Sequence, residues 1–297
     1  MTIHPIDGLV AGVRSVPGME RWLTMDLRPG TPAHLLTAFR TRNPTAPRLT
    51  WYGPDAERAE FSGRVLENWV AKTANYLVDE LDAEPGTVID LDLPLHWRSL
   101  VWILAAWAVG ATAVVTDSGA GTGADVVTGA DTGTVANTAG RADIVATTNP
   151  AAAQQRHGGA SPTPLLVAVA LPALQMRWMG ELPARALDYC GDVRAYADEF
   201  FADDTPDPSA TAWRHGATAI RYDELLAPKL ETAPESASQQ TASQQAPRRV
   251  LLEVRQGWAA VVPAALSAWA DGGSVVLLDT AVEPTEKLRS SENINQG

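Results

Sequence analysis

Two short groups of polar residues follow apolar strands, which is where ligand-binding side chains are expected in an α/β protein. His96 and Trp97 come after an apolar run at 87–93, and Thr116 and Asp117 close a second run that begins at residue 111. In open parallel sheets, ligands bind outside the carboxyl ends of the strands. An imidazole, an indole, a hydroxyl and a carboxylate at that edge predict a ligand crevice, without defining a catalytic constellation.

A packing role for the first pair is the alternative, and we favour it. Trp97 would then pack at the start of a helix, and His96 would face solvent. The five histidines include no pair four residues apart, and Cys190 is the one cysteine, so the sequence offers no zinc framework. We expect Cys190 to be a buried thiol and not a nucleophile, and we expect no metal site.

Two further motifs favour loops over sites. Residues 119–124 match the loose dinucleotide pattern G-x-G-x-x-A, but residues 125–129 do not read as the helix that must meet a pyrophosphate. The carboxylates of Asp203, Asp204 and Asp207 lack the alternating spacing and the glycine turn of a calcium loop. We therefore predict a flexible loop and a solvated acidic loop at these two places.

The elements that position these residues are strongly patterned. A helix is predicted over 63–81, with Ser62 as its N-cap and apolar residues recurring at helical spacing. A strand at 87–93, a helix at 97–109 that ends at Gly110, and a strand at 111–116 follow. Strand, helix and strand in this order predict a βαβ unit with parallel pairing and a right-handed crossover.

One twelve-residue pattern occurs twice. Residues 106–117 align without a gap to residues 268–279, and each copy reads as the end of an apolar helix, a glycine, a β-branched strand and an aspartate. Two copies of one helix–strand unit predict an α/β fold with two similar lobes, whose largely parallel sheets are covered by helices.

The remaining segments complete the expected domain organisation. A short helix is predicted at 33–39, strands at 48–52, 164–171 and 249–254, an amphipathic helix at 187–201, and a frayed end over the last ten residues. The predicted boundaries are an irregular segment at 1–30, a first lobe at 31–205 with a low-complexity insertion at 118–164, a region at 206–231, a disordered linker at 232–247, and a partial second lobe at 248–290.

The stretch from His34 to Asp117 resembles the entry segment of the adenylate-forming superfamily, which includes acyl-CoA synthetases, peptide-synthetase adenylation domains and luciferases. The pieces that carry the resemblance are Asn43-Pro44, residues 66–81, Pro85-Gly86-Thr87-Val88, residues 105–115 and, in the second lobe, residues 273–279. The chain is similar to part of the large N-terminal domain of that family, and to a group of short, uncharacterised relatives. This resemblance implies ATP or AMP, or CoA, as candidate ligands.

The chain departs from the family where the family does its chemistry. In the family, a glycine-rich phosphate loop that ends in T-G-x-P-K-G lies between the lobes, and residues 207–218 occupy roughly that place. They contain Gly216 as their one glycine and no lysine, whereas a phosphate cradle needs several N–H groups turned toward one anion. The family's small C-terminal domain and its lysine have no counterpart, so no functional residue is carried over, and this region is interpreted as a degenerate phosphate loop.

These observations predict a degenerate, non-catalytic homologue of acyl-adenylate-forming enzymes; if active, it would be an AMP-forming acid–thiol ligase. The alternative is a binding or regulatory module for a nucleotide, an acyl group, a CoA moiety or a complete homologue. A net charge of −12 argues against nucleic acid and anionic membranes as partners. The absence of an evident signal peptide and the lone cysteine predict a cytoplasmic protein.

Overall fold

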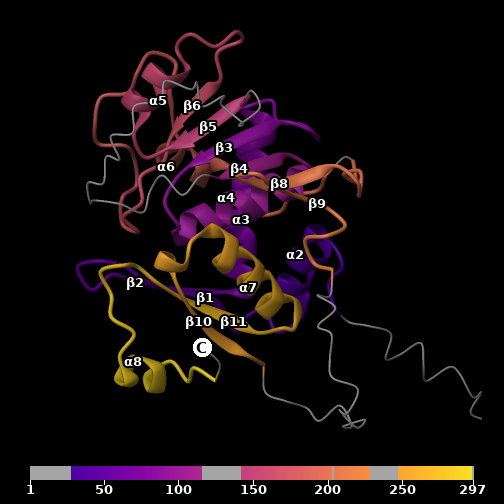
Figure 1. Cartoon of the computed structure of the whole chain (residues 1–297), viewed down its shortest axis with the longest axis vertical. Coiled ribbons are helices and arrows are strands. Elements are labelled where there is room, and N and C mark those ends of the chain that lie inside the picture. Colours follow the sequence, from indigo (N-terminus) through magenta and orange to yellow (C-terminus); the bar gives the residue numbers. More distant parts are fainter. Residues whose placement is uncertain (1–27, 116–141, 203, 228–246, 296–297) are drawn as a thin grey trace, which may run out of the picture.

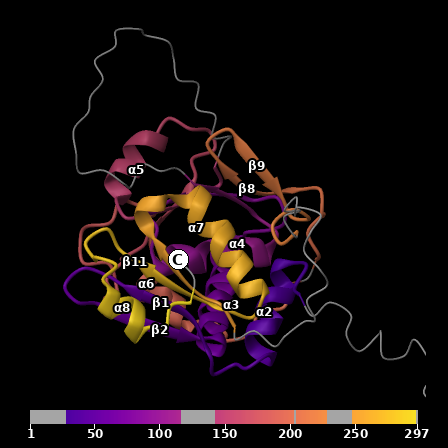
Figure 2. The ribbon, with the colours of Figure 1, turned by 60° about the horizontal axis from the view of Figure 1, so that its bottom comes forward.

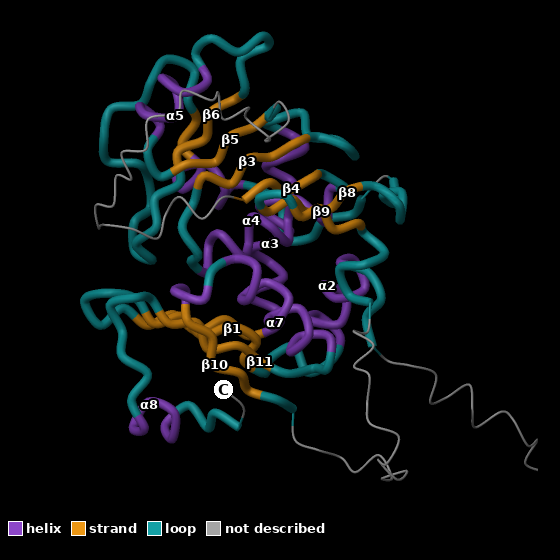
Figure 3. Tube along the Cα trace, in the orientation of Figure 1, coloured by secondary structure: helices purple, strands orange, loops and turns teal. Residues whose placement is uncertain are grey.

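The protein folds into two β-sheets separated by a layer of helices, as the computed structural model shows. The structure describes residues 28–115, 142–202, 204–227 and 247–295. Figures 1 and 3 show the helices α3 (Gly63–Asp79), α4 (Trp97–Val109) and α7 (Trp258–Ala270) between the two sheets. This α/β arrangement confirms the predicted fold class.

The larger sheet has seven strands, and all of its neighbouring pairs except one are parallel. Its strand order is β7 (Leu187–Asp188), β6 (Leu165–Ala168), β5 (Ile144–Thr147), β3 (Val88–Asp92), β4 (Thr112–Val115), β8 (Thr211–His215) and β9 (Thr218–Arg221). The hairpin β8–β9 is the antiparallel pair at one edge. The predicted unit of strand, helix and strand is confirmed as β3–α4–β4, whose strands pair in parallel.

The smaller sheet joins segments from the two ends of the described chain. Its order is β10 (Arg249–Glu253), β11 (Ser274–Leu278), β1 (Pro47–Tyr52) and β2 (Arg58–Ser62). The predicted first lobe spans residues 31–205, yet β1 and β2 from this span pair into the sheet of β10 and β11. No single point in the sequence therefore separates the strands of one sheet from those of the other.

Alternation along the strands divides the apolar residues between the faces of each sheet. Ile144, Ala146 and Val167 belong to the main core that the central helices share, whereas Val145 and Leu166 pack with Ala153 of α5 (Pro150–His157) on the outer face. In the smaller sheet, Leu251, Val276 and Leu278 likewise face away from the core, toward α8 (Glu286–Ser291). The molecule is thus layered as helix, sheet, helices, sheet and helix (Figure 1).

The two helices with the clearest sequence pattern form where the pattern predicts them. Helix α3 begins after Ser62, whose hydroxyl accepts the N–H of Val65, and α4 ends at Gly110, whose φ of 90° is left-handed. The helix predicted at 33–39 is confirmed as α2 (Pro32–Thr41), with Thr31 as N-cap. Figure 2 shows α7 beside α4 from a second direction.

The doubled pattern is structurally equivalent in its two copies. Gly110 and Gly272 both have a left-handed φ, of 90° and 76°. Trp107 donates its indole N–H to the carbonyl of Ala212 on β8 at 2.9 Å, and Trp269 donates to the carbonyl of Arg48 on β1 at 2.8 Å. In each copy, the tryptophan near the end of the helix hydrogen-bonds the strand that neighbours the β-strand following that helix. This equivalence confirms two similar lobes.

This equivalence gives a matched prediction for three buried tryptophans. We expect Trp107→Phe and Trp269→Phe each to cost about 1–2 kcal/mol more unfolding free energy than Trp102→Phe, because each removes a buried hydrogen bond. The indole N–H of Trp102, on the same helix as Trp107, has no partner in the structure. Urea denaturation of the three variants measures the difference; equal losses would show that these two hydrogen bonds add no stability.

The amphipathic helix predicted at 187–201 is wrong. After β7 come one turn of α-helix, α6 (Tyr189–Asp192), a 3-10 turn (Val193–Ala195) and an extended segment. Lys72 on α3 donates to the carbonyl of Arg194 at 3.3 Å, and Asn75 donates to those of Ala197 and Glu199 at 3.1 and 2.9 Å. These carbonyls are the acceptors that a continuing helix would have used internally, so tertiary contacts replace the helix.

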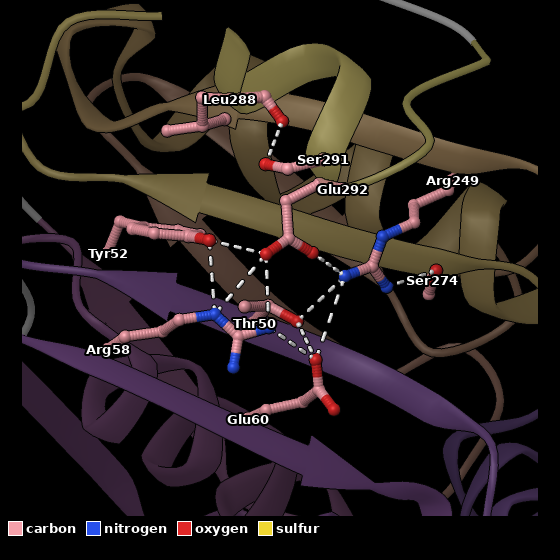
Figure 4. Close-up of polar contacts among 9 residues, drawn as sticks. All are labelled: Thr50, Tyr52, Arg58, Glu60, Arg249, Ser274, Leu288, Ser291 and Glu292. Atoms are coloured by element: carbon pink, nitrogen blue, oxygen red, sulfur yellow. Dashed lines mark hydrogen bonds and ion pairs between the residues drawn. The ribbon is translucent and has the colours of Figure 1, made fainter.

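The frayed end predicted for the last ten residues is also wrong over 288–295. Helix α8 lies on the outer face of the smaller sheet, where Leu288 and Ile294 pack against the cluster of Leu251, Val276 and Leu278. Figure 4 shows Glu292 at the centre of a polar network, where it accepts hydrogen bonds from Tyr52, Arg58 and Arg249. Its side chain is only 7% exposed. Although this segment is polar in composition, it contains a buried carboxylate that accepts hydrogen bonds from three side chains.

Several expectations fall on residues outside the described ranges: the irregular segment except residues 28–30, the loop at 119–124, most of the insertion at 118–164, Thr116, Asp117, Asp203, and the linker at 232–247 except Pro247. Within the described ranges, no helix has the length and apolar character needed to span a bilayer. The longest, α3, ends after 17 residues.

Candidate functional site

The carboxyl edge of β3 is occupied by packed side chains. His96 is the N-cap of α4, where its Nδ1 accepts the N–H of Arg98 at 3.2 Å. Its ring meets Trp51 of β1 edge-on at 4.6 Å, and the residue is 4% exposed, so the expectation that His96 faces solvent is wrong. Burial, with the nearby charge of Arg98, lowers the pKa of His96 to about 3, so the imidazole stays neutral.

Trp97 and Arg98 are buried in the same cluster. The Trp97 ring contacts Phe61 at 4.7 Å and Trp69 at 5.5 Å, and the Arg98 guanidinium lies 4.3 Å from the centre of the Trp97 ring. Arg98 also donates to the carbonyls of residues 171, 172 and 173. For His96 and Trp97 this geometry favours packing. A crevice shared with Thr116 and Asp117 stays a prediction, because those two residues are not among the described ones.

Residues 211–218 of the predicted phosphate-loop region form the edge hairpin β8–β9. His215 pairs with Thr218, so the turn consists of Gly216 and Ala217 alone. Before the hairpin, Asp207 accepts the N–H and the hydroxyl of Ser209, both at 2.8 Å. A turn of two residues is too short to direct several N–H groups at one phosphate.

A large cavity lies elsewhere, between α2, α3 and the end of α4. It has a volume of about 660 Å³, which is within the range of small-molecule sites. Residues 200–202, 204–206 and 208, together with Tyr222, complete its wall. Most of the lining is apolar: Ala33, Leu36, Val70, Ala71, Ala74, Trp107, Ala108, Phe200, Phe201 and Pro206.

Glu67 is the buried charged group of this cavity. Its side chain is 9% exposed, and Oε1 lies 3.7 Å from Nη1 of Arg40, which also lies 3.5 Å from Glu199. Among the described residues, none donates a hydrogen bond to the Glu67 carboxylate. Burial raises the pKa of Glu67, Arg40 lowers it, and the carboxylates of Glu199 and Asp198 raise it further.

Sequence reasoning missed this cavity, although a signal for Glu67 was present. Glu67 lies three and four residues before Val70 and Ala71, so it faces the apolar stripe of the helix. A carboxylate in such a stripe needs a partner or a ligand. Helical spacing alone could not show that α2 and residues 200–202, 204–206 and 208 would leave an open volume beside it.

A second titratable group lies on the outer face of the larger sheet. Asp90 is 8% exposed, and its Oδ2 lies 4.0 Å from Nε2 of His157. Burial, with the neighbouring Asp92, raises the pKa of Asp90 to about 6. Asp92 itself accepts the hydroxyl of Thr147 at 2.6 Å and forms an ion pair with Arg156. The described residues contain no group of three metal-ligating side chains.

The raised pKa gives a pH-dependent prediction. In the unfolded chain Asp90 has a pKa near 4, so the folded state binds the proton more tightly and loses stability as the pH rises from about 4 to about 6. Asp90→Asn removes this loss, so it should stabilise the protein by about 3 kcal/mol at pH 7.5 and by nearly nothing at pH 4. Urea midpoints at both pH values test this. Asp92→Asn is the control and should destabilise the protein at pH 7.5. A gain in stability from Asp90→Asn that is equal at both pH values would contradict the raised pKa of Asp90.

Comparisons with known proteins identify the fold. Over 89% of its length the chain is similar to an acyl-CoA synthetase from Brucella canis (TM-score 0.60, 17% identity) and to the N-terminal domain of FACL13 from Mycobacterium tuberculosis (TM-score 0.53, 12% identity). It covers 45% and 61% of those chains. A TIGR03089 family protein of Mycobacterium tuberculosis is 39% identical over 85 residues, which are 28% of this chain and 35% of that protein. No family model matches the chain.

These matches confirm the resemblance inferred from the sequence, at the level of the fold. The mixed α/β architecture is that of the N-terminal domain of acyl-CoA synthetases. The chain spans less than two thirds of the length of each of these relatives.

Proposed function

We propose that this chain has the scaffold of an acyl-CoA synthetase N-terminal domain but does not form acyl-adenylates. The observation that carries the proposal is the β8–β9 hairpin, in which Gly216 and Ala217 form the turn at the place expected for the phosphate loop. Adenylate formation requires the enzyme to hold the phosphates of ATP while a carboxylate attacks. A two-residue turn with no lysine offers neither a nest of N–H groups nor a side-chain cation for that task.

The neighbouring side chains support the same proposal. His96 and Trp97, which follow β3 in the sequence, are buried in aromatic packing. Lys72, one of the few lysines in the chain, forms an ion pair with Asp198 at 2.7 Å and also donates to the carbonyl of Arg194. Neither group is free to bind a phosphate.

ATP–pyrophosphate exchange tests this function. We expect the purified chain to catalyse no exchange above background with a panel of short, long and aromatic carboxylic acids, while a complete acyl-CoA synthetase exchanges label under the same conditions. Circular dichroism of the same sample establishes that it is folded. Robust exchange by this chain with any acid of the panel would refute the proposal.

A second candidate function is ligand binding without turnover, and the 660 Å³ cavity favours it. A ligand that binds the native state raises the melting temperature by mass action. Thermal-shift measurements with ATP, AMP, CoA and acyl-CoA therefore test the ligands that the resemblance implies. If none of these shifts the melting temperature while another small molecule does, binding stands and the nucleotide and acyl ligands are excluded.

A further inference from the structure

The cavity between α2, α3 and α4 offers acceptors but few free donors. Thr37 donates its hydroxyl proton to the carbonyl of Ala33 at 3.0 Å, and Tyr222 donates to the carbonyl of Ala111 at 2.8 Å. The charged groups of the wall are mainly carboxylates, and the hydroxyls of Thr31 and Thr205 also line it. Glu67, Asp204 and Asp223 all line the cavity, and Arg40 is its one basic residue.

The charges of this wall do not cancel. Arg40 is shared between Glu67 and Glu199, at 3.7 and 3.5 Å, so one guanidinium faces two carboxylates. Asp204 has no ion-pair partner among the described residues, whereas Asp223 is paired with Arg221 at 3.0 Å. A ligand that enters the cavity therefore meets a negative electrostatic potential. The potential acts most strongly next to Glu67, because water screens this nearly buried carboxylate least.

The nearby helix N-terminus does not reverse this preference. Helix α2 begins at the cavity wall, but Pro32 has no N–H, and Thr31 accepts the N–H of His34 through its hydroxyl and that of Leu35 through its carbonyl. An anion at this end of the helix could accept a hydrogen bond from the backbone N–H of Ala33, but few other backbone N–H groups are available to it. The Glu67 carboxylate, by contrast, has room for several donors and receives no hydrogen bond from the described residues.

We propose that this cavity binds a small amphiphile with an apolar body and a protonated amine head, and that the Glu67 carboxylate receives the amine. The inference rests on the ligand-binding function proposed above. The apolar body lies against Leu36, Val70 and Trp107, and the amine donates to the unpaired oxygen of Glu67, while Arg40 stays with Glu199. Burying a carboxylate without hydrogen bonds is costly, and a charged donor removes that cost.

Three compounds of one chain length separate the head group from the body: decylammonium, decanol and decanoate. We expect decylammonium to bind the unaltered protein at least about tenfold more tightly than decanol, and decanoate to bind most weakly. Isothermal titration calorimetry below the micelle concentration measures all three. This comparison needs no variant.

Two variants with matched controls then locate the site. Glu67→Gln should abolish the preference for decylammonium and leave the affinity for decanol unchanged, whereas Glu286→Gln on α8 should change neither. Ala33 is exposed on α2 and lines the cavity, so Ala33→Phe should weaken all binding by filling the volume. Ala151→Phe, at an exposed alanine of α5, is its control.

The possible failures are distinct. Binding of decanol or decanoate as tight as that of decylammonium would refute the amine head and leave the ligand-binding function standing. Binding that Ala33→Phe does not weaken would place the ligand outside this cavity and refute the inference. If none of the three compounds binds, the inference is refuted, and the thermal-shift measurements with nucleotides, CoA and acyl-CoA decide the ligand-binding function separately.

Discussion

Glu292→Ala is expected to lower the free energy of unfolding by about 3 kcal/mol or more. The carboxylate accepts hydrogen bonds from Tyr52, Arg58 and Arg249, and the side chain of Arg249 is itself only 14% exposed. Removing Glu292 leaves Tyr52 without its acceptor and leaves Glu60 as the remaining carboxylate beside Arg58 and Arg249, as Figure 4 shows. Chemical denaturation of the variant at neutral pH measures the loss.

Acid should produce the same effect in the unaltered chain. Burial raises the pKa of Glu292, but the hydrogen bonds from Tyr52, Arg249 and Arg58 outweigh it, so the net shift is downward. A lowered folded-state pKa means that this contribution is present at neutral pH and is lost as the pH falls through that pKa. Glu286→Ala, on the exposed side of α8, is the control and should have little effect. Equal losses from the two substitutions would contradict the role of the network.

Gly273→Ala should have the second large effect, also about 3 kcal/mol or more. A Cβ at this position would lie 2.3 Å from the carbonyl oxygen of Arg248 and 2.8 Å from that of Ala268. Both are backbone atoms, so β10 or the end of α7 would have to move. Thermal and urea unfolding measure the cost.

The control for this substitution is Gly159→Ala. No heavy atom lies within 4 Å of a Cβ at residue 159, and its φ is not left-handed. We expect that variant to change the stability by less than about 0.5 kcal/mol. If Gly273→Ala were equally mild, the close approach of β10 and β11 at this point would be looser than the structure has it.

The sequence predicted well the elements whose signals are local. The helices α3 and α4 each carry a long apolar pattern, and a cap or a terminating glycine marks where they begin or end, so periodicity located them closely. Strand β2 was not predicted, because burial alternates only weakly along it and its strand conformation depends on pairing with β1. The false helix at 187–201 fails because Lys72 and Asn75, more than a hundred residues away, bind its carbonyls.

For the candidate sites, too, local sequence signals were predicted correctly and tertiary contacts were not. His96 and Trp97 were rightly placed after a strand, but sequence could not show that Trp51 and Phe61 from the other sheet would cover them. Glu67 and Glu292 are single carboxylates in segments that read as an apolar stripe and a polar tail. Their importance arises from residues brought together by tertiary structure, which no window of sequence contains.

The pairing of β1 with β11 also determines when the chain can finish folding. Trp269 and Arg48, which hydrogen-bond across this junction, are 221 positions apart. A ribosome adds about 5–20 residues per second, so β1 emerges roughly ten seconds or more before the strand that completes its sheet. During that interval Leu49 and Trp51, both destined for the core, can pair with β2 on one side but lack β11 on the other. The nascent chain should therefore fold its larger sheet first and depend on chaperones to protect β1 until residue 278 has been synthesised.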